Sequence, residues 1–274
     1  NYDSSLYVTE RVFSVAADGT RIPITLLHKK DFVKDGSNPA HIIGYGSYGS
    51  SYDPYFSSQR FLLVDRGFVY AIAHIRGGGD LGRSWYESGK MLCKKNTFTD
   101  FISCTEHMIS EKYTSAGKVS MQGGSAGGLL MGAVVNMRPD LYGCVVAQVP
   151  FVDVVSTILD PTLRFSVLEY KEWGNPNEKN YYDYMMSYSP YDNISKQDYP
   201  PILATAGLND SRVNYWEPAK WVARLRDKST SDSVFLLRTE MGAGHQGPTG
   251  RYDAIKKSCF NLAFILKSLN YMSN

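Results

Sequence analysis

The stretch Met121-Gln122-Gly123-Gly124-Ser125-Ala126-Gly127-Gly128-Leu129-Leu130 decides how the rest of the sequence is interpreted. It contains the pattern G-x-S-x-G, in which a serine stands on a sharp turn between a strand and a helix. The strand and the helix cross closely there, so side chains do not fit two residues before or two residues after the serine. The flanking residues supply the required context, because 119–122 resemble a short strand and 126–137 resemble a helix. We therefore predict that Ser125 is a nucleophile exposed above the end of a sheet.

Composition excludes several classes of partner. The chain has 274 residues, of which 43% are hydrophobic, and this is enough to bury a large core in one domain. With 29 basic and 27 acidic residues the formal net charge is +2, which gives no global attraction to nucleic acid or to an anionic membrane. No apolar run approaches the length of a membrane span, and the first residues do not resemble a signal peptide. We expect one soluble domain over residues 1–274, with neither nucleic acid nor membrane as a partner.

The cysteines and glycines favour no metal or cofactor. Four cysteines are scattered without metal-ligand spacing and without the density of a disulfide scaffold: Cys93, Cys104, Cys144 and Cys259. We interpret them as reduced thiols, most of them small buried apolar side chains, and expect a cytoplasmic protein. The glycine-rich run 76–82 lacks the residue order and the lysine of a nucleotide-binding loop, so we expect no nucleotide cofactor.

The order of the elements predicts an α/β protein. Residues 6–13 and 21–28 alternate apolar and polar side chains around an Asp18-Gly19 turn, which predicts an antiparallel hairpin at the amino terminus. Short apolar runs then alternate with amphipathic segments. The predicted strands are 41–46, 68–73, 119–122, 143–149, 202–206 and 234–237, and the predicted helices are 56–65, 97–111, 126–137, 216–226 and 252–269. Together with the serine turn, this pattern predicts the α/β-hydrolase fold, a mostly parallel central sheet with helices on both faces.

One segment interrupts the alternation. Residues 150–200 are rich in tyrosine and acidic side chains and contain no obvious strand of the sheet. We expect this segment to lie above the carboxyl ends of the strands, where open α/β folds bind their ligands.

The order of the chain selects the partners of the serine. In this fold the acid follows the serine and the histidine comes last, because each is carried by a loop after a later strand. Four of the five histidines precede Ser125, so His245 is the remaining candidate, and glycines flank it. Asp210 follows the predicted strand 202–206 and is our choice for the acid. Asp153 also follows a strand, but it is the first strand after the serine, where we expect a capping or structural role.

These assignments imply definite chemical roles. His245 would accept the proton of Ser125 during attack and would later deliver it to the leaving group. Asp210 would fix the tautomer of the imidazole and stabilise its charged form. The backbone N–H of Ala126, directly after the nucleophile, would be the first donor to the oxyanion of the tetrahedral intermediate.

Longer runs carry a resemblance to a known family. They are Gly44-Tyr45-Gly46-Ser47-Tyr48-Gly49, Arg76-Gly77-Gly78-Gly79, the serine turn itself, Arg138-Pro139-Asp140-Leu141, Glu172-Trp173-Gly174-Asn175-Pro176, Tyr188-Ser189-Pro190-Tyr191-Asp192-Asn193 and Tyr215-Trp216-Glu217-Pro218. The chain resembles the catalytic domain of the prolyl oligopeptidase family, in particular its oligopeptidase B branch, from the hairpin to the last helix. The resemblance implies a serine peptidase that cuts short peptides after arginine or lysine.

The resemblance also implies further site residues. Tyr45 corresponds to a second oxyanion donor, where the residue pattern alone indicates a core side chain. Arg212 corresponds to an arginine that holds a substrate carbonyl, where an exposed ion pair is the ordinary interpretation. Glu169 corresponds to a glutamate that binds the basic side chain before the scissile bond, and two parallel hydrogen bonds would favour arginine over lysine. Where bacterial enzymes have a second glutamate, this chain has Lys171, which puts a pocket with two carboxylates in doubt.

Three other residues are assigned to substrate binding through the same resemblance. Trp173 either forms a wall of the pocket and stacks on the arginine stem or is a core aromatic residue. Tyr48 lies in the run that carries Tyr45. Asp53 corresponds to an acidic position that would favour a second basic residue in the substrate, although Tyr55 replaces its acidic companion.

The family places a β-propeller before this domain, and the chain shows no bladed repeat. The resemblance therefore implies that a propeller packs on this domain and that short basic peptides are its substrates. Two alternatives remain. One is a carboxylesterase or lipase-like hydrolase, which would have an apolar acyl pocket and no use for Glu169. The other is a binding domain that has lost its activity.

Overall fold

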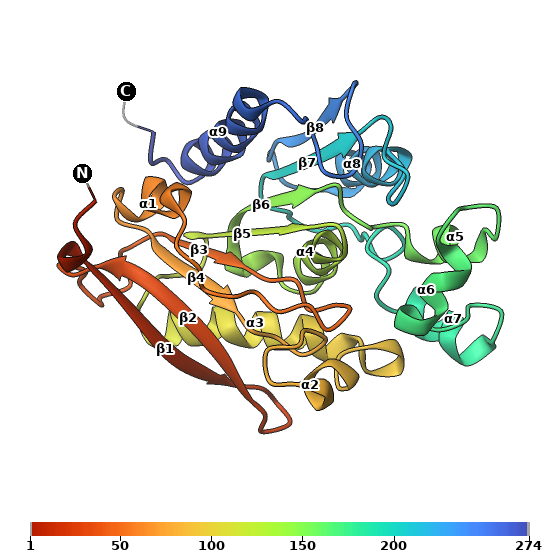
Figure 1. Cartoon of the computed structure of the whole chain (residues 1–274), viewed down its shortest axis with the longest axis horizontal. Helices are drawn as coiled ribbons and strands as arrows, with labels where there is room; N and C mark the ends of the chain where they lie inside the picture. Colours follow the sequence, from red (N-terminus) through yellow and green to blue (C-terminus); the bar gives the residue numbers. More distant parts are fainter. Residues whose placement is uncertain (1, 273–274) are drawn as a thin grey trace.

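The computed structural model of the protein describes residues 2–272. Its centre is an eight-stranded sheet with the strand order β1-β2-β4-β3-β5-β6-β7-β8 (Figure 1). The strands are β1 (Tyr7–Val15), β2 (Arg21–Lys29), β3 (Ala40–Ile43), β4 (Val69–Ala73), β5 (Val119–Gly124), β6 (Tyr142–Gln148), β7 (Ile202–Gly207) and β8 (Phe235–Glu240). Every strand that the apolar runs predict is present, with bounds shifted by a few residues.

The sheet combines an antiparallel edge with a parallel centre. β1 pairs with β2 as the predicted hairpin, and β2 pairs with β4 in the antiparallel sense. From β4 to β8 all neighbours are parallel. The carboxyl ends of β5, β7 and β8 therefore meet at one edge of the sheet, and the loops that follow these strands can share one site. This is the α/β-hydrolase fold that the sequence predicts.

Helices cover both faces of the sheet. The helices that pack on the two faces are α1 (Ser58–Val64), α3 (Lys95–Ser110), α4 (Ala126–Met137), α8 (Trp216–Lys228) and α9 (Arg251–Ser268). Successive residues of β6 point to opposite faces: Val145 belongs to the core under α3, α4 and α8, whereas Val146 packs with Ile265 of α9 in a second core. The buried stripe predicted for 97–111 is present on α3, where Phe98, Phe101 and Met108 are buried.

The segment 150–200 folds as three short helices, which the sequence does not predict individually. They are α5 (Val154–Leu159), α6 (Ser166–Trp173) and α7 (Lys179–Met186). All three lie beyond the tips of the parallel strands, at the right of Figure 1, as expected for this segment. A further short helix, α2 (Arg83–Glu87), follows the glycine-rich run and is also not predicted.

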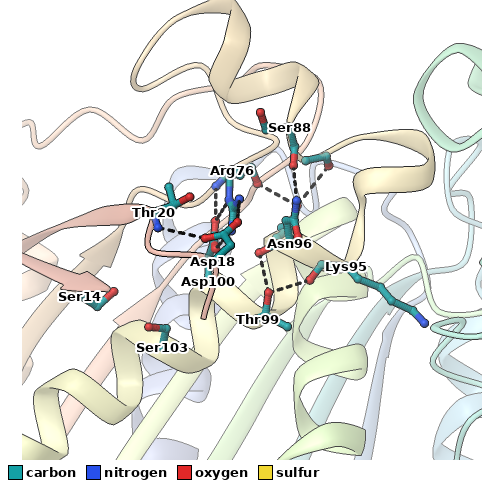
Figure 2. A network of polar contacts seen from close by, with 12 residues as sticks. Ser14, Asp18, Thr20, Arg76, Ser88, Lys95, Asn96, Thr99, Asp100 and Ser103 are labelled. Atoms are coloured by element: carbon teal, nitrogen blue, oxygen red, sulfur yellow. Dashed lines mark hydrogen bonds and ion pairs between the residues drawn. The ribbon is translucent and has the colours of Figure 1, made fainter. Parts of the chain in front are cut away.

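The glycine-rich run 76–79 has a structural role. The guanidinium of Arg76 donates two hydrogen bonds to Asp100 of α3 (2.8 and 2.6 Å) and one to Asp18 in the turn of the hairpin (2.6 Å). Figure 2 shows how this arginine joins the hairpin turn, the loop after β4 and α3. A Cβ on Gly77 would lie 2.1 Å from the carbonyl oxygen of Gly46, so the run packs directly against the loop after β3.

Within residues 2–272, no helix combines the length and the apolar character that crossing a membrane requires.

Candidate active site

Ser125 lies at the turn between β5 and α4, as the glycine pattern predicts. Its backbone has φ 57° and ψ −119°, a positive-φ conformation that non-glycine residues seldom adopt. The requirement for glycine is steric, because a Cβ built on Gly123 would lie 2.3 Å from the carbonyl oxygen of Gly127. The N–H of Ser125 donates to the carbonyl of Gln148 (2.8 Å) and ties the turn to the end of β6.

The predicted acid and base are hydrogen-bonded to each other. Nδ1 of His245, in the loop after β8, lies 2.7 Å from Oδ2 of Asp210, in the loop after β7. The other carboxylate oxygen of Asp210 accepts the backbone N–H groups of Arg212 (2.9 Å) and Val213 (3.0 Å). Burial opposes ionisation of this carboxyl, but the hydrogen bonds from His245 and from the two amides outweigh it and lower the pKa of Asp210. Asp210 is therefore held as a carboxylate that can orient an imidazole.

The loops that carry these two residues are joined by backbone hydrogen bonds. Leu208 N–H donates to the carbonyl of Glu240, and Asn209 N–H donates to the carbonyl of Ala243, each over 3.1 Å. The imidazole has a hydrogen bond to Asp210 but, among the described residues, none to the hydroxyl of Ser125. Such contacts are often long in enzymes without substrate and shorten when substrate binds.

Ser125 opens into a cavity of about 620 Å³ at the carboxyl edge of the sheet. Four parts of the chain form the cavity wall. The loop after β3 supplies Tyr45 and Tyr48, the turn after β5 supplies Ser125 and Ala126, and the loop after β7 supplies Arg212. The segment 150–200 supplies the rest of the wall, with Phe151, Thr157, Ile158, Arg164, Glu169 and Trp173 among its residues.

Two possible oxyanion donors lie in this cavity. Ala126 is the first residue of α4, so its backbone N–H has no acceptor within the helix. Tyr45 follows β3 by two residues, and its ring is half-buried in the cavity. Burial, together with the nearby Tyr52, raises the pKa of Tyr45 to about 12, so its phenol keeps its proton near neutral pH and can donate a hydrogen bond.

Glu169 lies on α6 at the wall of the same cavity, with two neighbours that fix its carboxylate. The hydroxyl of Tyr48 donates to Oε2 over 2.7 Å, and Nε1 of Trp173 donates to the same oxygen over 2.8 Å. Trp173 can reach Glu169 because the two residues are one helical turn apart. Both donors use Oε2, which leaves Oε1 for a donor from a bound molecule.

The neighbouring charged residues of α6 point elsewhere. Lys171 is exposed. Glu172 is 3% exposed, and it accepts the backbone N–H of Tyr48 (2.8 Å) and the hydroxyl of Tyr86 (2.6 Å). The cavity therefore contains one carboxylate from this helix. Trp173 combines the two roles that the sequence left open, because it is fully buried in the core and also lines the cavity.

Of the triad candidates, Ser125 lines the cavity, whereas Asp210 and His245 are not part of its wall. Among the residues assigned to substrate binding, Asp53 is the one that the structure does not bring into the cavity. It is exposed on the loop between β3 and α1 and is not part of the cavity wall. Its neighbour Tyr52 packs edge-on against Tyr45, with ring centroids 6.2 Å apart. Phe151 and Thr157 also line the cavity, and neither is among the site residues that the sequence predicts. Phe151 comes three residues after β6, so the rule that ligand sites follow strand ends could have identified it.

Comparisons with known proteins agree with this geometry. Residues 54–271 match the sequence profile of the Prolyl oligopeptidase family. The chain is 53% identical over 273 residues to dipeptidyl aminopeptidase BI of Pseudoxanthomonas mexicana, a match that covers 99% of this chain and 38% of the relative. It is 47% identical to protease 2 of Moraxella lacunata, over 98% of this chain and 39% of that relative.

Solved structures give the same result. Oligopeptidase B from Leishmania major has a TM-score of 0.97 and 49% identity, covering 99% of this chain and 38% of that one. Oligopeptidase B from Trypanosoma brucei, in a closed form with covalently bound antipain, also has a TM-score of 0.97 and 49% identity. This match covers 100% of this chain and 39% of that one.

The chain thus spans less than two fifths of the length of these relatives. The alignments to these relatives extend over nearly all of its own residues, and the profile match extends over residues 54–271. This chain belongs to the prolyl oligopeptidase family.

Proposed function

We propose that the protein is a serine peptidase that hydrolyses short peptides on the carboxyl side of arginine or lysine. The observation that carries the proposal is the place of Glu169, whose oriented carboxylate shares one cavity with the nucleophile candidate Ser125. A carboxylate that a bound substrate shields from bulk water pairs well with a guanidinium, through two parallel hydrogen bonds.

The proposed reaction proceeds through an acyl-enzyme. His245 accepts the proton of the Ser125 hydroxyl as the oxygen attacks the carbonyl carbon of the scissile bond. Asp210 stabilises the imidazolium, and the hydrogen bond that is present to Nδ1 supports this role. The imidazolium then gives its proton to the leaving amine as the tetrahedral intermediate collapses. A water molecule, deprotonated by His245, hydrolyses the resulting ester and restores the serine.

Stabilisation of the tetrahedral intermediate rests on two donors in this proposal. The N–H of Ala126 and the phenol of Tyr45 donate to the oxyanion, and both groups lie at the cavity beside Ser125. A donor directed at the oxyanion is worth roughly 10²–10³ in kcat when it is removed from serine proteases. In this proposal Arg212, which lines the cavity, holds a carbonyl of the substrate backbone.

Further parts of the proposal concern the whole protein. The relatives are more than twice as long as this chain, which supports a β-propeller that packs on a catalytic domain formed by residues 1–274. A propeller would restrict entry to short peptides. We place the protein in the cytoplasm, and the four free cysteines support a reducing compartment.

Cleavage profiling of a peptide library tests the proposal. We expect cuts after arginine and lysine, with arginine preferred, at internal positions of short peptides. The same library detects removal of amino-terminal dipeptides, the activity that the name of the Pseudoxanthomonas relative indicates for that protein. A parallel assay with an arginyl amide and a short-chain ester distinguishes a peptidase from the alternative, a carboxylesterase. Hydrolysis of the ester alone would refute the proposal that the protein is a peptidase.

A further inference from the structure

The segment from Tyr45 to Tyr48 carries both parts of the proposed chemistry. Tyr45 lies beside Ser125 at the cavity, and the hydroxyl of Tyr48 orients Glu169. The backbone between them is unusual, because Gly46 has φ 69° and Tyr48, which is not a glycine, has φ 57°. A strained conformation of this kind persists only when the surrounding structure holds it in place.

Lys94 holds one side of this segment. Its side chain is buried, with 1% of the residue exposed, and it comes directly before α3. The ammonium lies 2.5 Å from the carbonyl oxygen of Gly46, 2.8 Å from Oγ of Ser47 and 3.1 Å from the carbonyl oxygen of Gly89. These acceptors use all the donor capacity of a lysine. The ammonium also lies 5.2 Å from the centre of the Trp173 ring.

Glu172 holds the other side. Its buried carboxylate accepts the backbone N–H of Tyr48, the residue with the strained φ. The segment therefore lies between the buried amino group of Lys94 and the buried carboxyl group of Glu172, neither of which belongs to the cavity wall. Burial lowers the pKa of Lys94 to about 7, and the field of Glu172 opposes this shift. Burying an ammonium is unfavourable unless hydrogen-bond acceptors surround it. The acceptors that Lys94 has here come largely from the segment 45–48, so the lysine and this segment stabilise each other.

We infer that Lys94 is a positioning residue for the reaction, which fixes the backbone of residues 45–48 so that the Tyr45 phenol is directed at the oxyanion. The inference rests on the proposed function, because it assigns Lys94 a role through Tyr45. Lys94 itself does not touch the substrate. Displacing an oxyanion donor by about 1 Å can lower the rate roughly 100-fold, so the backbone anchor matters for kcat more than for KM.

A double-mutant cycle between Lys94→Met and Tyr45→Phe tests this inference in the protein. Methionine keeps the length of the side chain and removes its charge and donors. We expect Lys94→Met to lower kcat roughly 10- to 100-fold with a smaller change in KM. Tyr45→Phe should lower kcat roughly 100-fold. Because both changes remove the same contribution, the double variant should lie within about threefold of Tyr45→Phe alone.

Lys95→Met is the matched control. Its ammonium packs over the ring of Tyr184, 5.4 Å from the ring centre, and among the described residues it forms no hydrogen bond or ion pair with residues 45–48. Its kcat should equal that of the unchanged protein. If the effects of Lys94→Met and Tyr45→Phe multiply, or if Lys94→Met leaves kcat unchanged, the inference is wrong. If Lys94→Met does not fold, Ser47→Ala removes one of the three acceptors of Lys94, and the same cycle with Tyr45→Phe decides the question.

The outcome is separable from that of the proposed function. The substrate preference of the unchanged protein tests whether it is a peptidase for basic residues. The cycle is measured on whichever substrate the unchanged protein turns over, amide or ester, because both reactions pass through an oxyanion. A protein that hydrolyses only the ester would refute the proposed substrate, and multiplicative effects on that ester would refute the role of Lys94.

Discussion

Few types of residue tolerate the backbone conformation that Ser125 adopts. Its positive φ places the side chain at the top of the turn, where it lines the cavity, while its carbonyl accepts the N–H of Phe151 (3.1 Å). Strain of this kind is typical of functional residues that the surrounding structure over-determines. A smaller side chain does not disturb the contacts that hold the turn.

Ser125→Ala is the corresponding prediction. We expect the free energy of unfolding to stay within about 0.5 kcal/mol, since the change removes a hydroxyl at a cavity wall. Turnover should fall by at least roughly 10⁴-fold, because the remaining groups give only a small residual rate. Urea unfolding and kcat on the best peptide measure the two effects. Activity within tenfold of the unchanged protein would show that Ser125 is not the nucleophile.

Glu169 is the residue on which substrate preference depends. Glu169→Gln keeps the shape of the side chain and removes its charge. We expect kcat/KM for an arginyl amide to fall roughly 30- to 1000-fold, which corresponds to a loss of about 2–4 kcal/mol of transition-state stabilisation. The kcat/KM for a neutral substrate should change little. Glu178→Gln, on the exposed amino-terminal end of α7, is the matched control. If Glu169→Gln keeps the preference for arginine, Glu169 does not determine substrate specificity.

At the level of elements, the close crossing of β5 and α4 determines where the nucleophile lies. The crossing depends on Gly123, since any side chain there meets the backbone of Gly127. We expect Gly123→Ala to destabilise the protein by about 1–3 kcal/mol through overpacking, which lowers the Tm by roughly 2–10 °C, and to lower activity as well.

Gly242→Ala serves as the control for stability, because a Cβ at Gly242 has no atom within 4 Å. Thermal unfolding of the two variants gives the comparison. Equal Tm values for Gly123→Ala and Gly242→Ala would mean that the crossing is looser than the structure indicates.

A second element-level contact joins α8 to the cavity wall. The buried carboxylate of Glu217, in the first turn of α8, accepts the N–H groups of Val152 and Asp153 (both 3.0 Å) and the hydroxyl of Thr157 (2.8 Å). Thr157 and Phe151 line the cavity, so this carboxylate ties the wall to the helix that follows the Asp210 loop.

Burial raises the pKa of Glu217 to about 8, against the hydrogen bonds that favour its charged form. The folded state then binds this proton more tightly than the unfolded state, so its contribution to stability is full below about pH 4.5 and is lost as the pH rises through about 8. We expect the difference in unfolding free energy between the unchanged protein and Glu217→Gln to shrink from pH 5 to pH 8.5. Urea unfolding across this range measures it, with Glu178→Gln as the exposed control. A difference that does not vary with pH would show that Glu217 is charged in the folded protein.

At the scale of the whole molecule, the Arg76 network joins parts of the chain that are distant in sequence (Figure 2). Asp100 has a fully buried side chain, whereas Asp18 is 48% exposed. Removing one charge of a buried pair typically destabilises a protein by about 3–5 kcal/mol, and an exposed pair contributes about 0–1 kcal/mol. We therefore expect Asp100→Asn to lower the free energy of unfolding by about 3–5 kcal/mol and Asp18→Asn by less than about 1 kcal/mol. Similar losses in the two variants would contradict this account of the network.

Much of this architecture could be predicted from the sequence, and the physical reason differs between elements. The buried strands are continuous apolar runs, and α3 has a regular apolar stripe, so local pattern and final structure agree. The helices α5, α6 and α7 have only 6 to 8 residues, and their burial depends on contacts with distant loops rather than on a repeating pattern. They could not be predicted individually.

The candidate site shows the same division. Ser125, Asp210 and His245 follow from a motif and from the order of the chain. The contacts of Lys94 and Glu172 with the site could not be predicted, because their partners lie far away in sequence. Gly46 is a partner of the lysine, and Tyr48 is a partner of the glutamate. Charged residues in a sequence ordinarily indicate surface, and only the folded chain shows that these two are buried.

Site-specific labelling tests the central claim most directly, that Ser125 is the activated nucleophile of a site for basic peptides. The folded protein is treated with a fluorophosphonate, with and without a competing arginyl peptide, and the modified residue is mapped by mass spectrometry. We predict one phosphonyl group, on Ser125, and slower labelling in the presence of the peptide. Labelling of a different residue, or no labelling of Ser125 in the folded protein, would contradict the account.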